Sequence, residues 1–575
     1  MKLPPLKTDL ALRSILVPTC IAAMCGPAAA APLHVAFVHE ADGKPLTLDS
    51  LRHSNAAGET YSIARLDWLA TGFSVTTTDD VSHSFDDAVA FIPGTGSEFL
   101  LGQAPAGKIK SLTFHIGPDE KRNHGDPALH PPGHPLNPNV NRLHWDWQGG
   151  YIFLAIEGLW RRPGVGNEAM DGFSYHFARD PNRIAVTLPL EVNSNEASRV
   201  VIALDAHKLL DGLAFAADGA TTHSIEGDPV VPKLKTGLAS AFRVQAVEVG
   251  GVPRPVNRPK PIDLPANPQG YPITIPRHIP LPALPYDNPI LKQRVALGEK
   301  LFQETKLSRT NTLSCVSCHQ GDQGSDPRQF SLGVDGKQGT RHSMPLFNLA
   351  WKTKFFWDGR ANSLREQVLI PIQDPLEMDE TLENVVAKLK ADPAYPPLFS
   401  AAFGSGEITP QNIGLALENF LLTRLSFDSK PDKALQGGPA LTDQEKRGFE
   451  LFFTESEPRM GKRGADCFHC HGGANFTDHS FHNNGLTPTE DLGLGIVTGL
   501  ASDAYKFSTP SLRNVSRTAP YMHDGRFATI EEVIRHYNEP IKPSATLAPN
   551  LAKHPQGLKL TAEEMRDLAA FLKTL

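Results

Sequence analysis

Cys315-Val316-Ser317-Cys318-His319 and Cys467-Phe468-His469-Cys470-His471 are the two stretches that decide the fold of this 575-residue chain. Both read Cys-x-x-Cys-His. Two thiols at this spacing can add to the two vinyl groups of one porphyrin, and the histidine that follows places its imidazole under the iron. We therefore expect each motif to hold one covalent haem c, with His319 and His471 as the proximal iron ligands.

Two other chemistries use a Cys-x-x-Cys pair: a dithiol redox centre and half of a zinc site. The chain has six cysteines, and the two outside the motifs, Cys20 and Cys25, lie in a segment that we expect to be removed. The mature chain would then keep only the two pairs, each with a trailing histidine. This context favours haem over both alternatives.

The N-terminus has the layout of a secretory signal. Basic residues precede an apolar run over 15–24, and a stretch of alanines over 28–31 follows. We predict a signal peptide over 1–30 with cleavage near Ala30. An uncleaved anchor is the alternative, but the apolar core is shorter than the ~20 residues that a membrane span needs. The expected product is a periplasmic protein with no membrane span after cleavage.

Composition narrows the class of partner. Apolar residues make up 40% and charged residues 21%, and the formal net charge is -7. This balance is typical of a globular protein and argues against electrostatic attraction to nucleic acid. At roughly 100 to 200 residues per domain, the length allows two to four domains.

The pattern of the chain changes twice along its length. Over 31–250, short apolar runs alternate with turn residues, which predicts an all-β sandwich or barrel-like domain. A proline-rich linker over 251–288 follows. Beyond it, Thr442 with Glu445 and Thr529 with Glu532 have the capping-box spacing of helix starts. We expect two mainly α haem domains, over 289–435 and 436–575.

The C-terminal half resembles a known family. The matching segments are Leu307-Ser308-Arg309, Phe356-Trp357-Asp358-Gly359-Arg360, Pro375-Leu376-Glu377-Met378 and Thr518-Ala519-Pro520-Tyr521-Met522-His523-Asp524-Gly525. Residues 287–575 are similar to the bacterial diheme cytochrome c peroxidases and, among them, to the MauG and MbnH type. The resemblance implies tandem cytochrome c-like domains, two covalent haems and hydrogen peroxide as the oxidant.

Three residues receive catalytic roles from this resemblance. Trp357 matches the tryptophan that passes electrons between the haems, although a buried core aromatic is the common alternative. Gln367 and Glu377 match the distal polar residues of the peroxide-binding haem. Helical spacing places Gln367 on an apolar face, where a buried amide needs a partner. Glu377 is our candidate acid and base for the proton of peroxide, and a solvated loop carboxylate is the alternative.

The axial ligands separate the subfamilies. The loop over 333–337 carries no histidine that could cap the first iron, so we expect that iron to be open. At the second haem, Tyr537 stands where the peroxidases have a methionine and where MauG and MbnH have a tyrosine. Core packing of Tyr537 is the alternative. A phenolate oxygen stabilises high-valent iron, so the resemblance implies that the two haems can store oxidising equivalents. Such storage suits an enzyme that oxidises a protein side chain.

Calcium is a weaker expectation. The family's calcium site between the haems uses backbone oxygens, which match Thr518 and Pro520, and an asparagine side chain. Here the asparagine position is His342. Imidazole is a poor ligand for a hard cation.

The N-terminal domain resembles the MbnP, or metallo-mystery pair, family. The resemblance rests on Asn123-His124, Pro135-Leu136-Asn137 and the stretch over 145–153 that begins Trp-Asp-Trp. It implies a copper site and a tryptophan that becomes kynurenine. Our candidate copper ligands are His39, His124 and His144, although histidines in such loops are usually solvated. Trp145 and Trp147 are the candidates for oxidation, with Trp68 in reserve.

We therefore predict a diheme oxidoreductase fused to its own substrate, in which peroxide drives oxidation of a tryptophan in the β domain. One alternative is an ordinary cytochrome c peroxidase that draws electrons from a small donor protein. Another is a copper-binding protein whose haem half only carries electrons.

Overall fold

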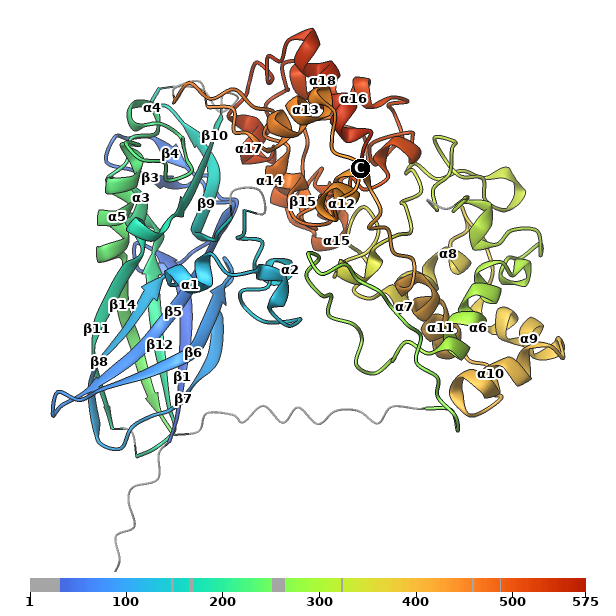
Figure 1. The fold of residues 1–575 in the computed structure, drawn as a ribbon, viewed down its shortest axis with the longest axis horizontal. Helices are drawn as coiled ribbons and strands as arrows, with labels where there is room; N and C mark the ends of the chain where they lie inside the picture. Colours follow the sequence, from blue (N-terminus) through green and yellow to red (C-terminus); the bar gives the residue numbers. More distant parts are fainter. Residues whose placement is uncertain are drawn as a thin grey trace, which may run out of the picture.

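The computed structural model describes residues 31–145, 149–164, 170–193, 195–250, 264–321, 324–457, 460–486 and 488–575. The predicted signal peptide, residues 251–263 of the predicted linker and Trp147 lie outside the described residues. A β-rich domain lies on one side of the molecule and a mainly helical half on the other (Figure 1). This arrangement confirms the predicted fold class.

The first sheet of the β domain has the order β14-β12-β1-β2. β7 also pairs with β1, along Pro32–Phe37. The pairing of β1 with β12 is parallel, with Val35 opposite Val200. A sequence pattern of short strands favours antiparallel neighbours, so this long-range parallel pair was not expected. The strands are β1 (Pro32–Ala41), β2 (Lys44–Pro45), β7 (Ser97–Gln103), β12 (Ser198–Asp205) and β14 (Phe242–Val249).

The second sheet has the order β11-β8-β5-β9-β10-β13, with β6 paired to β5, and β3 and β4 joined to β9. Strict alternation of buried and exposed residues along β11 gives this sheet one face in the core and one in solvent. Its strands are β3 (His53–Ser54), β4 (Thr60–Tyr61), β5 (Arg65–Thr77), β6 (Ser82–Ile92), β8 (Lys108–Ile116), β9 (Ile152–Arg161), β10 (Asp171–Ala178), β11 (Ile184–Asn193) and β13 (Thr221–Thr222).

The core of the β domain lies between these sheets. Trp68 is fully buried there and packs edge-on against Phe37, with ring centroids 4.8 Å apart. Phe114 packs against both rings. Short helices complete the domain: α1 (Glu120–Asn123), α2 (Pro138–Asn141), α3 (Ala206–Leu210), α4 (Phe215–Asp218) and α5 (Val230–Ala241).

The helical half repeats one packing arrangement. Gly298 of α6 lies so close to α11 that an added Cβ would be 2.0 Å from Ala416 O, and Gly448 of α13 lies equally close to Asp567 O of α18. Only glycine permits such close helix crossings. The first region contains α6 (Lys292–Phe302), α7 (Leu364–Gln367), α8 (Ile370–Gln373), α9 (Leu382–Ala391), α10 (Tyr395–Phe403), α11 (Pro410–Leu422) and α12 (Lys430–Leu435).

The second region starts at the helix that the capping box predicts. Thr442 and Glu445 exchange hydrogen bonds at the start of α13, and Thr529 and Glu532 do so at the start of α16. The elements are α13 (Asp443–Phe453), α14 (Phe468–His471), β15 (Phe481–His482), α15 (Leu494–Thr498), β16 (Phe507–Ser508), α16 (Ile530–Asn538), α17 (Pro549–Ala552) and α18 (Ala562–Leu572). No helix among the described residues is both long and apolar enough to cross a membrane.

The β domain docks on the second of these regions through α17, which packs on β9 and β10 (Figure 1). Leu159 of β9 forms an apolar cluster with Ile541, Leu547 and Ala552. Gly172 of β10 lies against α17, where an added Cβ would be 1.9 Å from Pro549 O. This contact explains why β9 is buried along almost its whole length.

Candidate haem centres and interdomain pocket

The first Cys-x-x-Cys-His motif opens onto a large cavity in the helical half. His319 Nδ1 lies 2.8 Å from Gly324 O, so the ring donates this N–H and leaves Nε2 for a metal ion. Burial lowers the pKa of His319, which favours the neutral ring that iron needs. The cavity is lined by the residues that sequence reasoning selected for this centre: Cys315, Cys318, His319, Trp357, Gln367 and Glu377.

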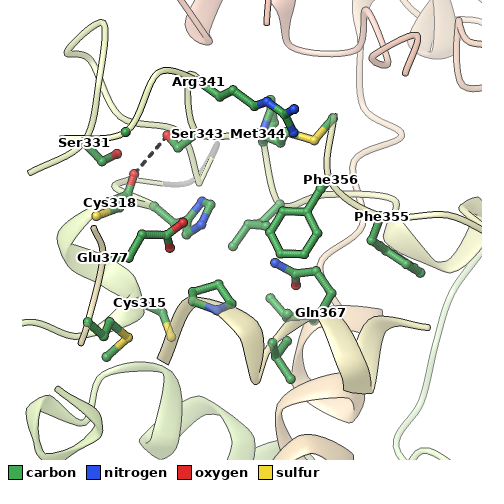
Figure 2. Close-up of a pocket in the computed structure, with 18 of the residues that line it drawn as sticks. Cys315, Cys318, Ser331, Arg341, Ser343, Met344, Phe355, Phe356, Gln367 and Glu377 are labelled. Carbon is green, nitrogen blue, oxygen red and sulfur yellow. Dashed lines mark hydrogen bonds between the residues drawn. The ribbon is translucent and has the colours of Figure 1, made fainter. Parts of the chain in front are cut away.

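Glu377 has the properties of a proton carrier. Burial raises the pKa of its carboxyl group to about 7, Asp374 adds to the rise, and Arg360 opposes it. Figure 2 shows the carboxyl group of Glu377 and the amide of Gln367 directed toward the same space from different segments. A carboxyl group with this pKa can both accept and release a proton near neutral pH.

Gln367 ends the short helix α7, whose N-cap is Ser363. Ser363 accepts a hydrogen bond from Glu366 N, while the Glu366 carboxylate accepts one from Asn362 N instead of completing a capping box with Ser363. The helix is interrupted after one turn, and α8 follows. Even so, the predicted face, with Gln367, lines the cavity.

Trp357 lies between the two haem-motif regions. Its indole Nε1 donates to His342 O at 2.8 Å, and its own carbonyl accepts from Ser508 N of β16 at 2.8 Å. The side chain is 7% exposed and borders the first cavity. This position fits a residue that connects the two centres.

The second motif forms α14, and His471 repeats the arrangement of His319: its Nδ1 lies 3.1 Å from Phe476 O. Tyr537 lies on α16, and its hydroxyl group is 3.5 Å from Asn484 Nδ2. Burial raises the pKa of Tyr537, and the nearby thiols of Cys470 and Cys467 raise it further. The residues around both motifs therefore fit two covalent haems.

The residues at the expected calcium position do not fit a hard cation. Both ring nitrogens of His342 have protein partners, Ser325 Oγ at 3.2 Å and Gln329 O at 3.2 Å. Thr518 Oγ1 donates to Val515 O. The imidazole of His342 offers a hard cation no oxygen ligand.

Each of the three histidines proposed for copper contacts a different partner. His39 is buried and accepts a hydrogen bond from the indole of Trp68 at 3.1 Å. His124 binds Asp180 at 2.6 Å on the surface, and His144 packs against Tyr151. Among the described residues, no group of three or more metal-ligating side chains contains any of the three.

Trp145 lies in a second pocket, between the β domain and the second haem motif. Its side chain is 5% exposed, and its ring stacks on His223 with centroids 5.5 Å apart and planes 28° from parallel. His223 in turn packs on Phe468, inside the motif, at 6.0 Å. The structure thus brings one of the two candidate tryptophans to the second haem centre.

Sequence reasoning did not identify the imidazole cluster beside Trp145. His176, His223 and His469 have ring nitrogens within 4.8 Å of one another, and Glu455 contacts two of the rings. His469 occupies a variable position of the Cys-x-x-Cys-His motif. Because the other two lie far away in the chain, only the docking of the domains reveals the cluster.

Comparison with known proteins agrees with this geometry. The family model for di-haem cytochrome c peroxidase matches residues 292–440, and the MbnP model matches residues 30–225. The MauG protein of Methylorubrum extorquens is 41% identical over 293 residues, which are 50% of this chain and 79% of the relative. The chain belongs to the di-haem cytochrome c peroxidase family.

Other members of the di-haem cytochrome c peroxidase family show the same extent of match. Cytochrome c551 peroxidase of Pseudomonas aeruginosa is 33% identical over 299 residues, 50% of this chain and 80% of the relative. A solved MauG-like protein associated with microbial copper homeostasis is 35% identical, with a TM-score of 0.48, and the match covers 53% of this chain and 95% of that one. The sequence relatives support an oxidoreductase of this family, and the MbnP model identifies an additional N-terminal domain.

Proposed function

We propose that this chain is a periplasmic, peroxide-dependent oxidoreductase of the MauG and MbnH type that oxidises Trp145 of its own MbnP domain to kynurenine. The observation that supports this most directly is the pocket that Trp145 shares with Phe468 and His469 of the second haem motif. Trp68, by contrast, is enclosed in the β-domain core.

The chain's own residues supply the proton chemistry. Glu377 accepts a proton from peroxide as the oxygen–oxygen bond is broken and returns it to the departing oxygen. Gln367 offers its amide to the same space and orients the oxidant. When bound, the two haems supply the reaction with peroxide and the storage of oxidising equivalents.

A series of rings leads from the second motif to the substrate. Phe468 lies next to Cys467 in the chain and packs on His223, which stacks on Trp145. Successive contacts of this kind allow an electron to leave Trp145 toward the Cys467 segment. Trp357 is the corresponding connection between the two haem regions.

The overall reaction balances with peroxide and water alone. Two molecules of hydrogen peroxide convert tryptophan to N-formylkynurenine and two of water, and hydrolysis then releases formate to leave kynurenine. Because enzyme and substrate share one chain, the effective concentration of substrate is high and no partner need dock.

Copper binding by the MbnP domain is the second part of the proposal. It rests on the resemblance to MbnP and on the imidazoles around Trp145. The candidates from sequence, His39, His124 and His144, stay predictions. Ring opening of Trp145 would add an amine and a carbonyl beside the imidazoles that contact this residue, His176 and His223.

Two other functions have distinct signatures. The match to cytochrome c peroxidases favours peroxide reduction with electrons from a small donor protein. Such an enzyme would turn over with reduced cytochrome and leave Trp145 intact. A copper protein with an electron-carrying haem half would bind copper and fail to react with peroxide.

Intact mass spectrometry of the haem-loaded protein before and after peroxide tests the main proposal. We expect loss of one carbon and gain of one oxygen in the wild type and no such change in Trp145→Phe. An identical change in the variant would move the reaction to another residue.

A further inference from the structure

Three imidazoles from two domains converge beside the second haem motif. His176 lies on β10, His223 follows β13, and His469 lies on α14. Their side chains are 3%, 6% and 2% exposed. Glu455, which follows α13, joins them: its Oε2 is 3.0 Å from His223 Nε2 and 3.0 Å from His469 Nε2. The cluster exists only because the two domains are docked.

One imidazole is already oriented as a metal ligand. His176 Nε2 lies 3.0 Å from Glu157 Oε1, and a carboxylate can only accept, so Nε2 carries the proton. Its Nδ1 is then a lone pair directed at His223 Nε2, 3.2 Å away. Glu157 is itself fixed by Arg65 at 3.0 Å and Asn550 at 3.0 Å. In metal sites the second ring N–H of a ligating histidine is commonly held by a carboxylate in this way.

The other two imidazoles share one acceptor. His223 and His469 both direct Nε2 at the same oxygen of Glu455. The ring nitrogens of His176, His223 and His469 lie within 4.8 Å of one another, so the three rings face a common point with Glu455 beside it. A cation at that point would take its coordinate bonds from the three rings and leave a fourth position for water, a ligand set that zinc accepts.

The charges around the cluster also favour a cation. Four carboxylates and two cationic side chains lie around the cluster, and each cation is shared by two carboxylates. If the imidazoles are neutral, two negative charges are therefore in excess. The contacts are Arg65 with Asp67 at 2.7 Å and Glu157 at 3.0 Å, and Lys553 with Glu455 at 2.5 Å and Asp466 at 3.4 Å. A divalent ion would neutralise this excess without leaving a buried charge unpaired.

We propose that the imidazoles of His176, His223 and His469, with the Glu455 carboxylate beside two of them, form an interdomain site for a divalent transition ion of the zinc or copper class. Nitrogen ligands suit both ions, and the carboxylate favours the divalent state. None of its ligands is among the histidines predicted for copper from sequence. The ion ties the MbnP domain to the second haem domain through their buried surfaces. The site does not depend on oxidation of Trp145.

The test uses haem-loaded full-length protein, stripped with a chelator and titrated separately with Zn²⁺ and Cu²⁺. Metal content after gel filtration and calorimetry give the stoichiometry and affinity. We expect one ion per chain, a higher unfolding temperature with metal, and nitrogen couplings in the Cu²⁺ resonance spectrum. The two titrations show which ion binds more tightly.

His223→Gln and His469→Gln should each weaken binding by at least about tenfold. His83→Gln, which removes an exposed imidazole on β6 of the same domain as His223, should bind like the wild type. If His469→Gln reduces haem loading, His223→Gln still tests the site, because it lies outside the motif. Absence of tight binding in the wild type, or unchanged binding in His223→Gln, would overturn the proposal.

Discussion

The indole of Trp145 stacks on the imidazole of His223 with ring centroids 5.5 Å apart, and His223 packs on Phe468 of the second haem motif at 6.0 Å. The stack crosses the boundary between the MbnP domain and the helical half. A side chain of the proposed substrate is therefore connected to the oxidising half through packed rings. The predictions below test the parts of this connection.

Glu377→Gln should slow the reaction of haem-loaded protein with peroxide by about 10² to 10⁴-fold, because an amide cannot accept the proton. In the wild type the carboxylate is the active form, and its pKa is about 7. The rate should therefore rise with pH up to about 7 and level off above it. Stopped-flow mixing across this range measures both effects.

Glu383→Gln is the matched control, since this carboxylate is exposed at the start of α9. It should keep the wild-type rate and pH profile. If Glu377→Gln also keeps them, another residue moves the proton.

Trp357→Phe should suppress modification of Trp145 while both haems load normally, because we propose that the indole passes electrons between the two haem regions. Peptide mapping after peroxide treatment measures the modification. Trp351→Phe is a close control: it also loses a buried indole hydrogen bond, from Nε1 to Pro280 O at 2.8 Å, at a cost of about 1 kcal/mol. Equal suppression in both variants would indicate a stability effect.

Tyr537→Phe should change the electron paramagnetic resonance signal of the second haem and leave that of the first largely unchanged, because only the second would lose its proposed phenol ligand. Tyr521→Phe in the same region removes a hydroxyl that donates to Val515 O at 2.9 Å and should change neither signal. Two identical six-coordinate signals in the wild type would contradict both the open first iron and the Tyr537 ligand.

Gly172→Ala should separate the domains. The added Cβ would be 1.9 Å from Pro549 O, so α17 cannot stay docked on β10. We expect normal haem loading, faster proteolysis between the domains and little modification of Trp145. Gly212→Ala has open space around its Cβ and should behave as the wild type. Full modification in an undocked Gly172→Ala protein would show that the interface is not the route.

Local sequence signals were sufficient for much of this account. The Cys-x-x-Cys-His motifs and the caps at Thr442 and Thr529 act over a few residues, so they could be read directly. Tyr537 and Glu377 needed the family resemblance, since a lone tyrosine or glutamate has no distinctive local pattern.

The interdomain cluster could not be predicted in this way. His176 and His223 come together because β10 and β13 pair, and His469 joins them through domain docking. Periodicity describes one element at a time, and it does not say which faces of two domains meet. The parallel pairing of β1 with β12 was missed for the same reason.

Peptide mass spectrometry of haem-loaded protein after peroxide shows whether the chain's own haem domains oxidise Trp145. We predict that Trp145 loses one carbon and gains one oxygen, whereas Trp68 and Trp160 stay unchanged. Trp145, Trp147 and Trp160 share the tryptic peptide over 143–161, so fragmentation must assign the site. If every tryptophan of the MbnP domain stays unmodified in protein with both haems, the account is wrong, and peroxide reduction with an external donor takes its place.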